Sequence, residues 1–487
     1  MSCIVLNIWR KLVKSIFVFI FMVELKKVGE FEWNVGDSGK VFASEVLVEN
    51  IDSGVLEQVR NVSELLGIIG KSLAMPDMHM GYGFPIGGVA AFDLESGVIS
   101  PGGVGYDINC SVRLLKTNLV EADLKGKEKE IAHSLFRSIP SGVGRGGDLK
   151  LSDSELDEVL VGGAQWAVEK GYGFEEDWKH IEDEGKLDGR SEFVSGKAKG
   201  RGRDQLGTLG AGNHFLDVLV VDEVFDLEVA KVFGLEKGQV VILIHCGSRG
   251  LGHQVASDYI EEMGKRADGL ACAPINSELG KKYFGAMNAA ANFAFANKQI
   301  ITHLVREDLK NYFADFKADV VYDVCHNIAK IEEHAFREKI EDGRWKMEEK
   351  EVLVMRKGAT RAFGPGRKEI PEDYRKVGQP VLLPGSMGTA SYVLVGTKEA
   401  EKKSWGSCAH GAGRACSRSE SYDKISFDEA VVDMEKRGVF VEAGKKKGMI
   451  EESPVSYKDV DEVVRVCDAV GLGKKVVRLR PILVVIG

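Results

Sequence analysis

Proline is scarce in this sequence, which has 11 prolines among 487 residues. With 44% hydrophobic and 29% charged residues, this scarcity excludes a long disordered tract and is typical of a folded soluble protein. The length allows one large domain or two to three ordinary ones. Because no internal repeat or low-complexity linker divides the chain, we predict one interwoven domain over residues 22–487.

The chain also has few cysteines and no net positive charge. The eight cysteines form no CxxC pair and show no regular spacing, which excludes a disulfide scaffold and indicates reduced thiols in the cytoplasm. The net charge of -9 argues against a protein that coats nucleic acid, since such binding needs many Lys and Arg residues. Basic islands such as Lys197–Arg203 still permit a local basic groove, although each is also typical of a solvated face.

A long apolar run is missing as well. The stretch Ile16–Val23 follows two lysines like a signal peptide, but its eight residues are too few to span a bilayer. No small-residue cleavage site follows it, and Met22 opens a conventional charged start. We therefore expect residues 1–21 to be an upstream extension or a dispensable tail, and we expect no membrane partner.

Strand patterns and helix patterns are segregated along the chain, which favours the α+β class. We predict helices at Leu56–Leu66, at Asp153–Lys170 within a charged helical region, and at Leu279–Phe316, where small residues suit close packing. Glycine-rich strands and loops are expected at Met75–Arg113. Further strands are expected at 207–221, at 240–254 with a polar loop at its end, and at 320–327, 352–365 and 381–395.

Histidines gather where predicted strands give way to glycine or polar residues. A lone histidine in such a place is most often a structural, hydrogen-bonded one, but similar contexts recur at His79, His214, His245, His326 and His410. Asp107 and Cys110 lie three residues apart in a loop of the same kind. Together these side chains supply oxygen, sulfur and nitrogen ligands, a set that suits Mn, Fe, Co or Zn. A capping Asp and a buried free Cys are the ordinary alternatives.

Two nucleotide-binding patterns are absent or weak. No GxxxxGK[ST] loop occurs, and GVGRGG at 142–147 lacks the strand-to-helix setting of a dinucleotide fingerprint. The stretch EGKLDGR at 184–190 contains the K-x-D-G lysine motif of classical nucleic-acid ligases. Its acidic neighbours would keep Lys186 charged, so we interpret the match as accidental. By contrast, the small residues of SCAHGAGR at 407–414 let a bulky guest such as a nucleotide approach His410.

Assembled in order, these segments resemble the RtcB-type RNA ligases, the tRNA-splicing ligase family. The resemblance runs over roughly residues 23–487. Its motifs are MPDMHMGYGFPIGGV (75–89), GYDINCSVR (105–113), RDQLGTLGAGNHFLDV (203–218), HCGSRGLGHQ (245–254), AANFAFANKQ (290–299), DVCHNIAK (323–330), RKGATRAFGPG (356–366), PGSMGTASYVLVG (384–396) and SCAHGAGR.

The resemblance implies a GTP- and Mn(II)-dependent ligase. Such enzymes seal RNA ending in a 2',3'-cyclic phosphate or 3'-phosphate to RNA with a 5'-hydroxyl, in tRNA splicing or RNA repair. His410 would form a covalent histidine-GMP intermediate, GMP would pass to the RNA 3'-phosphate, and the 5'-hydroxyl would displace it. A small protein, archease, assists some members of the family.

The resemblance also implies roles for individual residues. Two Mn(II) ions would share Cys110, with Asp107 and His214 on one metal and His245 and His326 on the other. The RNA path would include Arg201 and Arg203. The expected nucleotide contacts are Asn213, Asp217, Asn327, Ser386, Ser391, Gly411, Ala412, Gly413 and Arg414.

Three positions depart from the family pattern. Met355 replaces a histidine before RKGAT, Asp217 replaces a glutamate expected to read guanine, and Ile486 stands where a lysine contacts the nucleotide. These changes bear on guanine selectivity more than on catalysis, because the nucleophile and the five metal ligands remain. Two other functions stay open from the residues alone: a two-metal RNA phosphoesterase that does not ligate, and an inactive RNA-binding paralogue, which would have eroded metal ligands.

Overall fold

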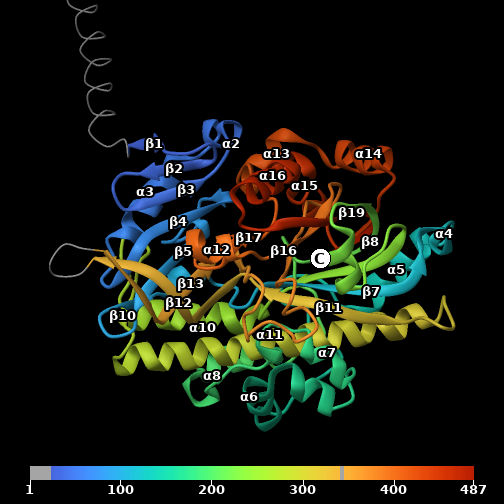
Figure 1. Cartoon of the computed structure of the whole chain (residues 1–487). Coiled ribbons are helices and arrows are strands. Elements are labelled where there is room, and N and C mark those ends of the chain that lie inside the picture. Colours follow the sequence, from blue (N-terminus) through green and yellow to red (C-terminus); the bar gives the residue numbers. More distant parts are fainter. Residues whose placement is uncertain (1–23, 340–344) are drawn as a thin grey trace, which may run out of the picture.

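The computed structural model describes residues 24–339 and 345–487 (Figure 1). The expected extension at residues 1–21 lies outside these ranges. Helices and two large mixed sheets form one α+β domain, which confirms the predicted fold class. Within the described ranges, every helix is either too short or too polar to cross a bilayer.

The first sheet has seven strands in the order β1-β2-β3-β4-β5-β13-β12, and only β3 and β4 pair in parallel. It joins the N-terminal third of the chain to a hairpin from much later in the sequence. Its strands are β1 (Leu25–Lys27), β2 (Glu32–Val35), β3 (Gly39–Phe42), β4 (Ile68–His79), β5 (Ile86–Asp93), β12 (Asn327–Lys339) and β13 (Trp345–Lys357).

The second sheet follows the order β11-β7-β9-β8-β19-β16-β15, and β18 pairs in parallel with β19. Its strands are β7 (Ser111–Val120), β8 (Phe215–Val224), β9 (Gln239–Cys246), β11 (Ala318–Cys325), β15 (Pro380–Leu383), β16 (Ser391–Val395), β18 (Phe440–Ala443) and β19 (Lys474–Ile486). Two small ladders pair β6 (Val98–Ile99) with β10 (Ala273–Pro274) and β14 (Ala359–Arg361) with β17 (Ser407–Ala409). The second ladder holds the strand that leads into His410.

Helices pack around these sheets, and the long helix α11 runs beneath both in the view of Figure 1. The helices are α2 (Glu45–Glu49), α3 (Ser53–Ser63), α4 (Glu121–Leu124), α5 (Glu128–Ser138), α6 (Asp153–Glu169), α7 (Glu175–Lys179), α8 (Gly196–Gly202), α9 (Leu227–Phe233), α10 (Arg249–Glu262), α11 (Glu278–Lys310), α12 (Lys398–Ser404), α13 (Arg418–Lys424), α14 (Phe427–Arg437), α15 (Lys446–Glu451) and α16 (Val460–Val470). The predicted helices at 56–66, 153–170 and 279–316 correspond to α3, α6 and α11.

Helix α11 forms the centre of the core. Its small residues, including Ala289, Ala290 and Ala294, are fully buried and let α6 and α10 pack closely against it. Its last turns carry buried charge that is paired: Arg306 binds both carboxylate oxygens of Asp177, at 2.6 and 2.7 Å. Because a buried charge without a partner is costly, such pairs fix how the surrounding helices sit.

One local prediction was wrong. The polar stretch after β9 was expected to be a loop, but α10 begins at Arg249. Leu251, Val255 and Ala256 of this helix are buried in the core, and Gly250 N donates to Gln205 Oε1 at 2.9 Å. Tertiary packing thus overrides the low helix propensity of glycine.

Candidate active site

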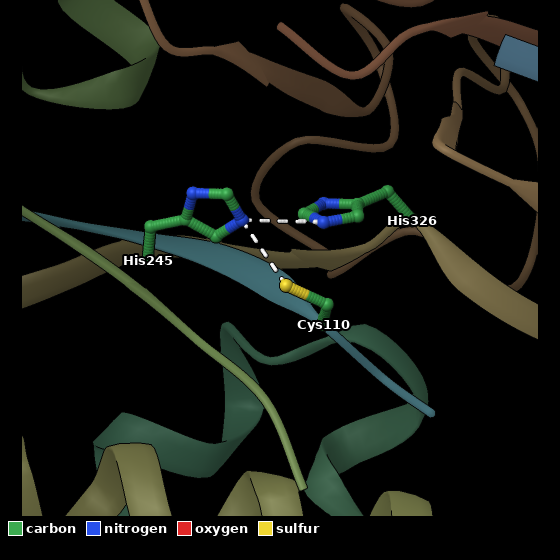
Figure 2. Close-up of side chains that lie close together, drawn as sticks. All are labelled: Cys110, His245 and His326. Carbon is green, nitrogen blue, oxygen red and sulfur yellow. Dashed lines mark hydrogen bonds between the residues drawn. The ribbon is translucent and has the colours of Figure 1, made fainter. Parts of the chain in front are cut away.

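Four side chains converge on the thiol of Cys110. Its Sγ lies 3.2 Å from His245 Nε2 and 3.5 Å from His214 Nε2. His245 Nε2 is also 3.3 Å from His326 Nε2, as the dashed lines of Figure 2 show. On the other side, His214 Nε2 lies 2.6 Å from Asp107 Oδ2. Two groups that could each hold a metal ion therefore share Cys110: one with His245 and His326, the other with Asp107 and His214.

Sheet register explains why residues so far apart in sequence meet. Strands β11, β7, β9 and β8 are neighbours, so their ends bring Cys110, His245, His214 and His326 to the same edge. Asn109 adopts a left-handed conformation, with φ 51°, which is uncommon for residues other than glycine but tolerated by Asn. Its side chain donates to Ala291 O at 2.8 Å, so helix α11 anchors the turn that presents Cys110.

The electrostatics of the cluster suit metal ligands. Burial lowers the pKa of His245 and of His326 well below the ordinary value, so both imidazoles are neutral. Burial, followed by the charge of Asp107, raises the pKa of the Cys110 thiol to about 12. A divalent cation reverses such a shift, because a coordinating thiol loses its proton. The mixed donor set and the buried cluster thus fit a divalent transition metal.

His410 stands beside this cluster, held by a carboxylate that the sequence analysis did not single out. The ring of His410 lies 5.0 Å from that of His326, centroid to centroid. Asp77, which is completely buried, accepts from His410 Nδ1 at 2.5 Å and from the backbone N–H groups of His410 and Gly411 at 2.9 and 3.3 Å. Burial alone would raise the pKa of Asp77, but the contacts with His410 outweigh it and leave the pKa lowered. The carboxylate is therefore ionised and leaves Nε2 of His410 available.

A large cavity opens in front of His410. Its volume is about 1010 Å³, enough for a nucleoside triphosphate, and His245 and His326 belong to its wall. Of the residues expected to contact a nucleotide, seven line it: Asn213, Asn327, Ser386, Gly411, Ala412, Gly413 and Arg414. A Cβ at Gly413 would lie 2.1 Å from Asp77 O, so only glycine fits there.

The remaining expected contacts lie elsewhere. Ser391 does not line the cavity; its Oγ accepts from Gly385 N at 3.1 Å and so shapes the cavity loop. Asp217 is buried in β8 on the same face as Phe215, which does line the cavity. Burial raises the pKa of Asp217 well above its ordinary value, and its Oδ1 has no hydrogen-bond partner in the described structure.

Arg201 and Arg203, the expected RNA contacts, are both exposed at the end of α8. Arg201 Nη1 donates to Gln254 Oε1 at 3.0 Å, whereas Arg203 forms an ion pair with Asp153. Lys186 of the K-x-D-G match is exposed and does not line the cavity.

The three departures from the family pattern fall in different environments. Ile486 lines the cavity. Isoleucine in the place of the expected lysine leaves this part of the wall without a positive charge. Met355 is completely buried in the core, and its Sδ accepts from Ser100 N at 3.5 Å. Met355 therefore does not reach a bound nucleotide directly.

The sequence analysis also did not single out several polar residues of the cavity wall, among them Lys357, Tyr457 and Lys458. Lys357 donates to Phe84 O at 3.1 Å, and burial lowers its pKa to about 7. Tyr457 lies under the guanidinium of Arg414, 5.1 Å from ring centroid to Cζ. Lys458 donates to Met78 O, and burial lowers its pKa to about 8. Only Lys357 stood in a quoted motif; no local pattern marks the other two.

Comparison with known proteins shows the family of this chain. A family model described as "tRNA-splicing ligase RtcB" matches residues 58–487. A tRNA-splicing ligase RtcB of Archaeoglobus fulgidus is 50% identical over 480 residues, covering 94% of this chain and 98% of the relative. The Methanococcus maripaludis and Pyrobaculum aerophilum proteins of that name are each 50% identical, over 92% and 96% of this chain and 95% and 99% of their own length. The chain belongs to the RtcB family of tRNA-splicing ligases.

Proposed function

We propose that the protein is a GTP- and Mn(II)-dependent RNA ligase that acts through a covalent histidine-GMP intermediate on His410. It would join RNA ends carrying a 2',3'-cyclic phosphate or 3'-phosphate to ends carrying a 5'-hydroxyl, in tRNA splicing or RNA repair. The observation that carries this proposal is His410, which is held by Asp77 at the edge of the Cys110 cluster and faces a cavity of about 1010 Å³.

In this proposal, His410 is the nucleophile and Asp77 orients it. Asp77 accepts the proton on Nδ1, so the lone pair of Nε2 is free to attack the α-phosphorus of GTP. A bond between Nε2 and phosphorus forms, the bond to the bridging oxygen breaks, and pyrophosphate leaves. Positive charge develops on the imidazole during the attack, and the adjacent carboxylate stabilises it.

The later steps return His410 to its starting state. An oxygen of the RNA 3'-phosphate attacks the GMP phosphorus and displaces Nε2 of His410. The 5'-hydroxyl oxygen of the second RNA then attacks the 3'-phosphorus and gives up its proton to solvent, and GMP leaves as the new phosphodiester forms. The neutral imidazole is a suitable leaving group and nucleophile near pH 7.

Two metal ions would be held by the shared Cys110, one with Asp107 and His214, the other with His245 and His326. When bound, such ions neutralise the phosphates and clamp the attacking and leaving oxygens of an in-line displacement. Carboxylate oxygen suits manganese, whereas imidazole and thiolate suit several other first-row metals, so the choice of manganese rests on the family resemblance.

For the nucleotide, we propose contacts with Asn213, Asn327, Ser386 and the loop 411–414, all of which line the cavity. Asp217 does not line the cavity, so its proposed part in guanine recognition rests on the family resemblance. Arg201 and Arg203 would contact the RNA. The seven cysteines in the described residues are free thiols, in keeping with the proposed cytoplasmic location. Archease is the proposed protein partner.

The test is covalent labelling of the purified protein with α-labelled GTP or ATP and Mn(II), read by denaturing gel and mass. We expect label from GTP in the wild type and none in His410→Ala. His133→Ala is the matched control, because His133 is an exposed histidine of α5. Absence of label with either nucleotide, with archease added, would refute the ligase and leave the phosphoesterase, which needs no His410.

A further inference from the structure

Three aromatic rings form a row beside the cavity. The rings of Tyr82 and Tyr106 lie 5.7 Å apart at 50°, and those of Tyr106 and His253 are stacked, 4.8 Å apart at 25°. The three residues come from separate segments: the loop between β4 and β5, the turn before β7, and helix α10. The fold thus gathers the row, since no stretch of sequence contains it.

Two of the three rings belong to the cavity that His410 lines. Tyr82 and Tyr106 line the same cavity as His410, and Tyr106 directly precedes Asp107. Tyr82 is 37% exposed and its neighbour Met80 is 45% exposed, while His253 lies on the exposed face of α10. Large apolar side chains that remain open beside a functional cavity are typical of a binding surface.

A cation flanks the far end of the row. Arg201 lies next to His253, and its guanidinium is fixed by Gln254 at 3.0 Å. Burial, followed by the charge of Arg201, lowers the pKa of His253, so its ring is neutral at pH 7 and can stack. Aromatic rings can stack on the bases of a nucleic acid, and a neighbouring positive charge can bind its phosphates.

We propose that Tyr82, Tyr106 and His253 are a stacking platform for the bases of single-stranded RNA next to a reacting end, with Arg201 against the backbone. This inference rests on the proposed function in that RNA is the substrate. Base stacking on aromatic rings does not depend on the sequence of the RNA. A chain with a net charge of -9 gains less affinity from phosphate contacts, and stacking adds to that affinity. A ligase that seals many RNA ends needs such tolerance.

The test is equilibrium binding of a short fluorescent single-stranded RNA with a 3'-phosphate, without GTP or metal. We expect Tyr82→Ala and Tyr106→Ala to raise Kd by about 5- to 150-fold, as the loss of one stacked base predicts. Tyr106→Phe keeps the ring and should bind like the wild type. Arg201→Gln should weaken binding and lower the salt dependence by about one ion.

A second probe separates stacking from folding defects. Removing the bases from the nucleotides nearest the 3'-phosphate should lower wild-type affinity to that of the alanine variants, and those variants should then lose nothing further. Equal wild-type affinity for the normal and base-free probes, or alanine variants that bind the normal probe like the wild type, would overturn the platform. Because this assay uses no GTP, failed labelling of His410 would refute the proposed function while leaving the platform supported by its own result.

Discussion

The bond between Asp77 and His410 provides the sharpest test of how the site works. Replacing Asp77 by Asn keeps the size of the side chain and one acceptor oxygen for the backbone N–H groups of His410 and Gly411, which lie 2.9 and 3.3 Å away. It removes the negative charge that faces His410 Nδ1 at 2.5 Å. The fold should therefore survive, and the chemical effect should be confined to the imidazole.

The size of the expected effect follows from the role of the hydrogen bond between Asp77 and His410 while His410 attacks the phosphorus of GTP. A hydrogen bond to a charged group contributes about 1.5 to 3 kcal/mol, and this one strengthens as the ring gains positive charge. Losing it from the transition state slows GMP uptake by about 10- to 150-fold. Because Nδ1 and both backbone N–H groups contact the same oxygen, Oδ2, we expect the Asn oxygen to take that place and to keep a neutral hydrogen bond to Nδ1, so that the loss reflects the missing charge.

The assay is single-turnover labelling of His410 with α-labelled GTP and Mn(II), comparing the wild type, Asp77→Asn and Asp226→Asn. Asp226 is the matched control, because it caps α9 by accepting from Val229 N and Asn caps a helix equally well. An Asp77→Asn protein of unchanged melting temperature that takes up GMP within threefold of the wild-type rate would refute the orienting role of the carboxylate.

Three further predictions concern metal binding, pH dependence and core stability. Cys110→Ala should abolish binding of both metal ions in calorimetric Mn(II) titration, whereas His326→Ala should spare one, because only Cys110 belongs to both groups. Lys357 has a pKa of about 7 when folded and near 10.4 when unfolded, so the unfolded chain binds more protons between these values and stability rises with pH. From pH 7 to pH 9 that rise is about 2 kcal/mol, and Lys357→Met should remove it in denaturant unfolding. Asp177→Ala leaves a buried guanidinium unpaired and should cost about 3 to 5 kcal/mol in the same assay.

Each of these has a control within the chain. Cys272→Ala changes a free thiol outside both metal groups and should leave the Mn(II) titration as it is. Asp188→Ala breaks an exposed pair with Arg190 and should cost under about 1 kcal/mol. Equal metal stoichiometry for Cys110→Ala and wild type, a pH dependence that persists in Lys357→Met, or equal losses for the Asp177 and Asp188 variants would contradict the respective arguments.

Local pattern was sufficient for most elements. Apolar spacing predicted the helix α3, and runs of Val and Ile predicted strands such as β9, because periodicity records which face is buried. It failed at Arg249, where two glycines in a polar stretch were interpreted as loop. Burial of Leu251 and Val255 in the core and the bond from Gly250 N to Gln205 decide that segment, and contacts of that kind are invisible to periodicity.

The sequence by itself determined the family resemblance and the residues that the structure brings together around Cys110, because the motif that carries each of them is short and contiguous. Only the tertiary structure decided which of them touch. Asp77 precedes His410 by 333 residues, and the rings of Tyr82, Tyr106 and His253 come from three segments. The physical reason is that the packing of sheets and helices sets these distances, whereas the chemistry of a side chain is fixed by its identity alone.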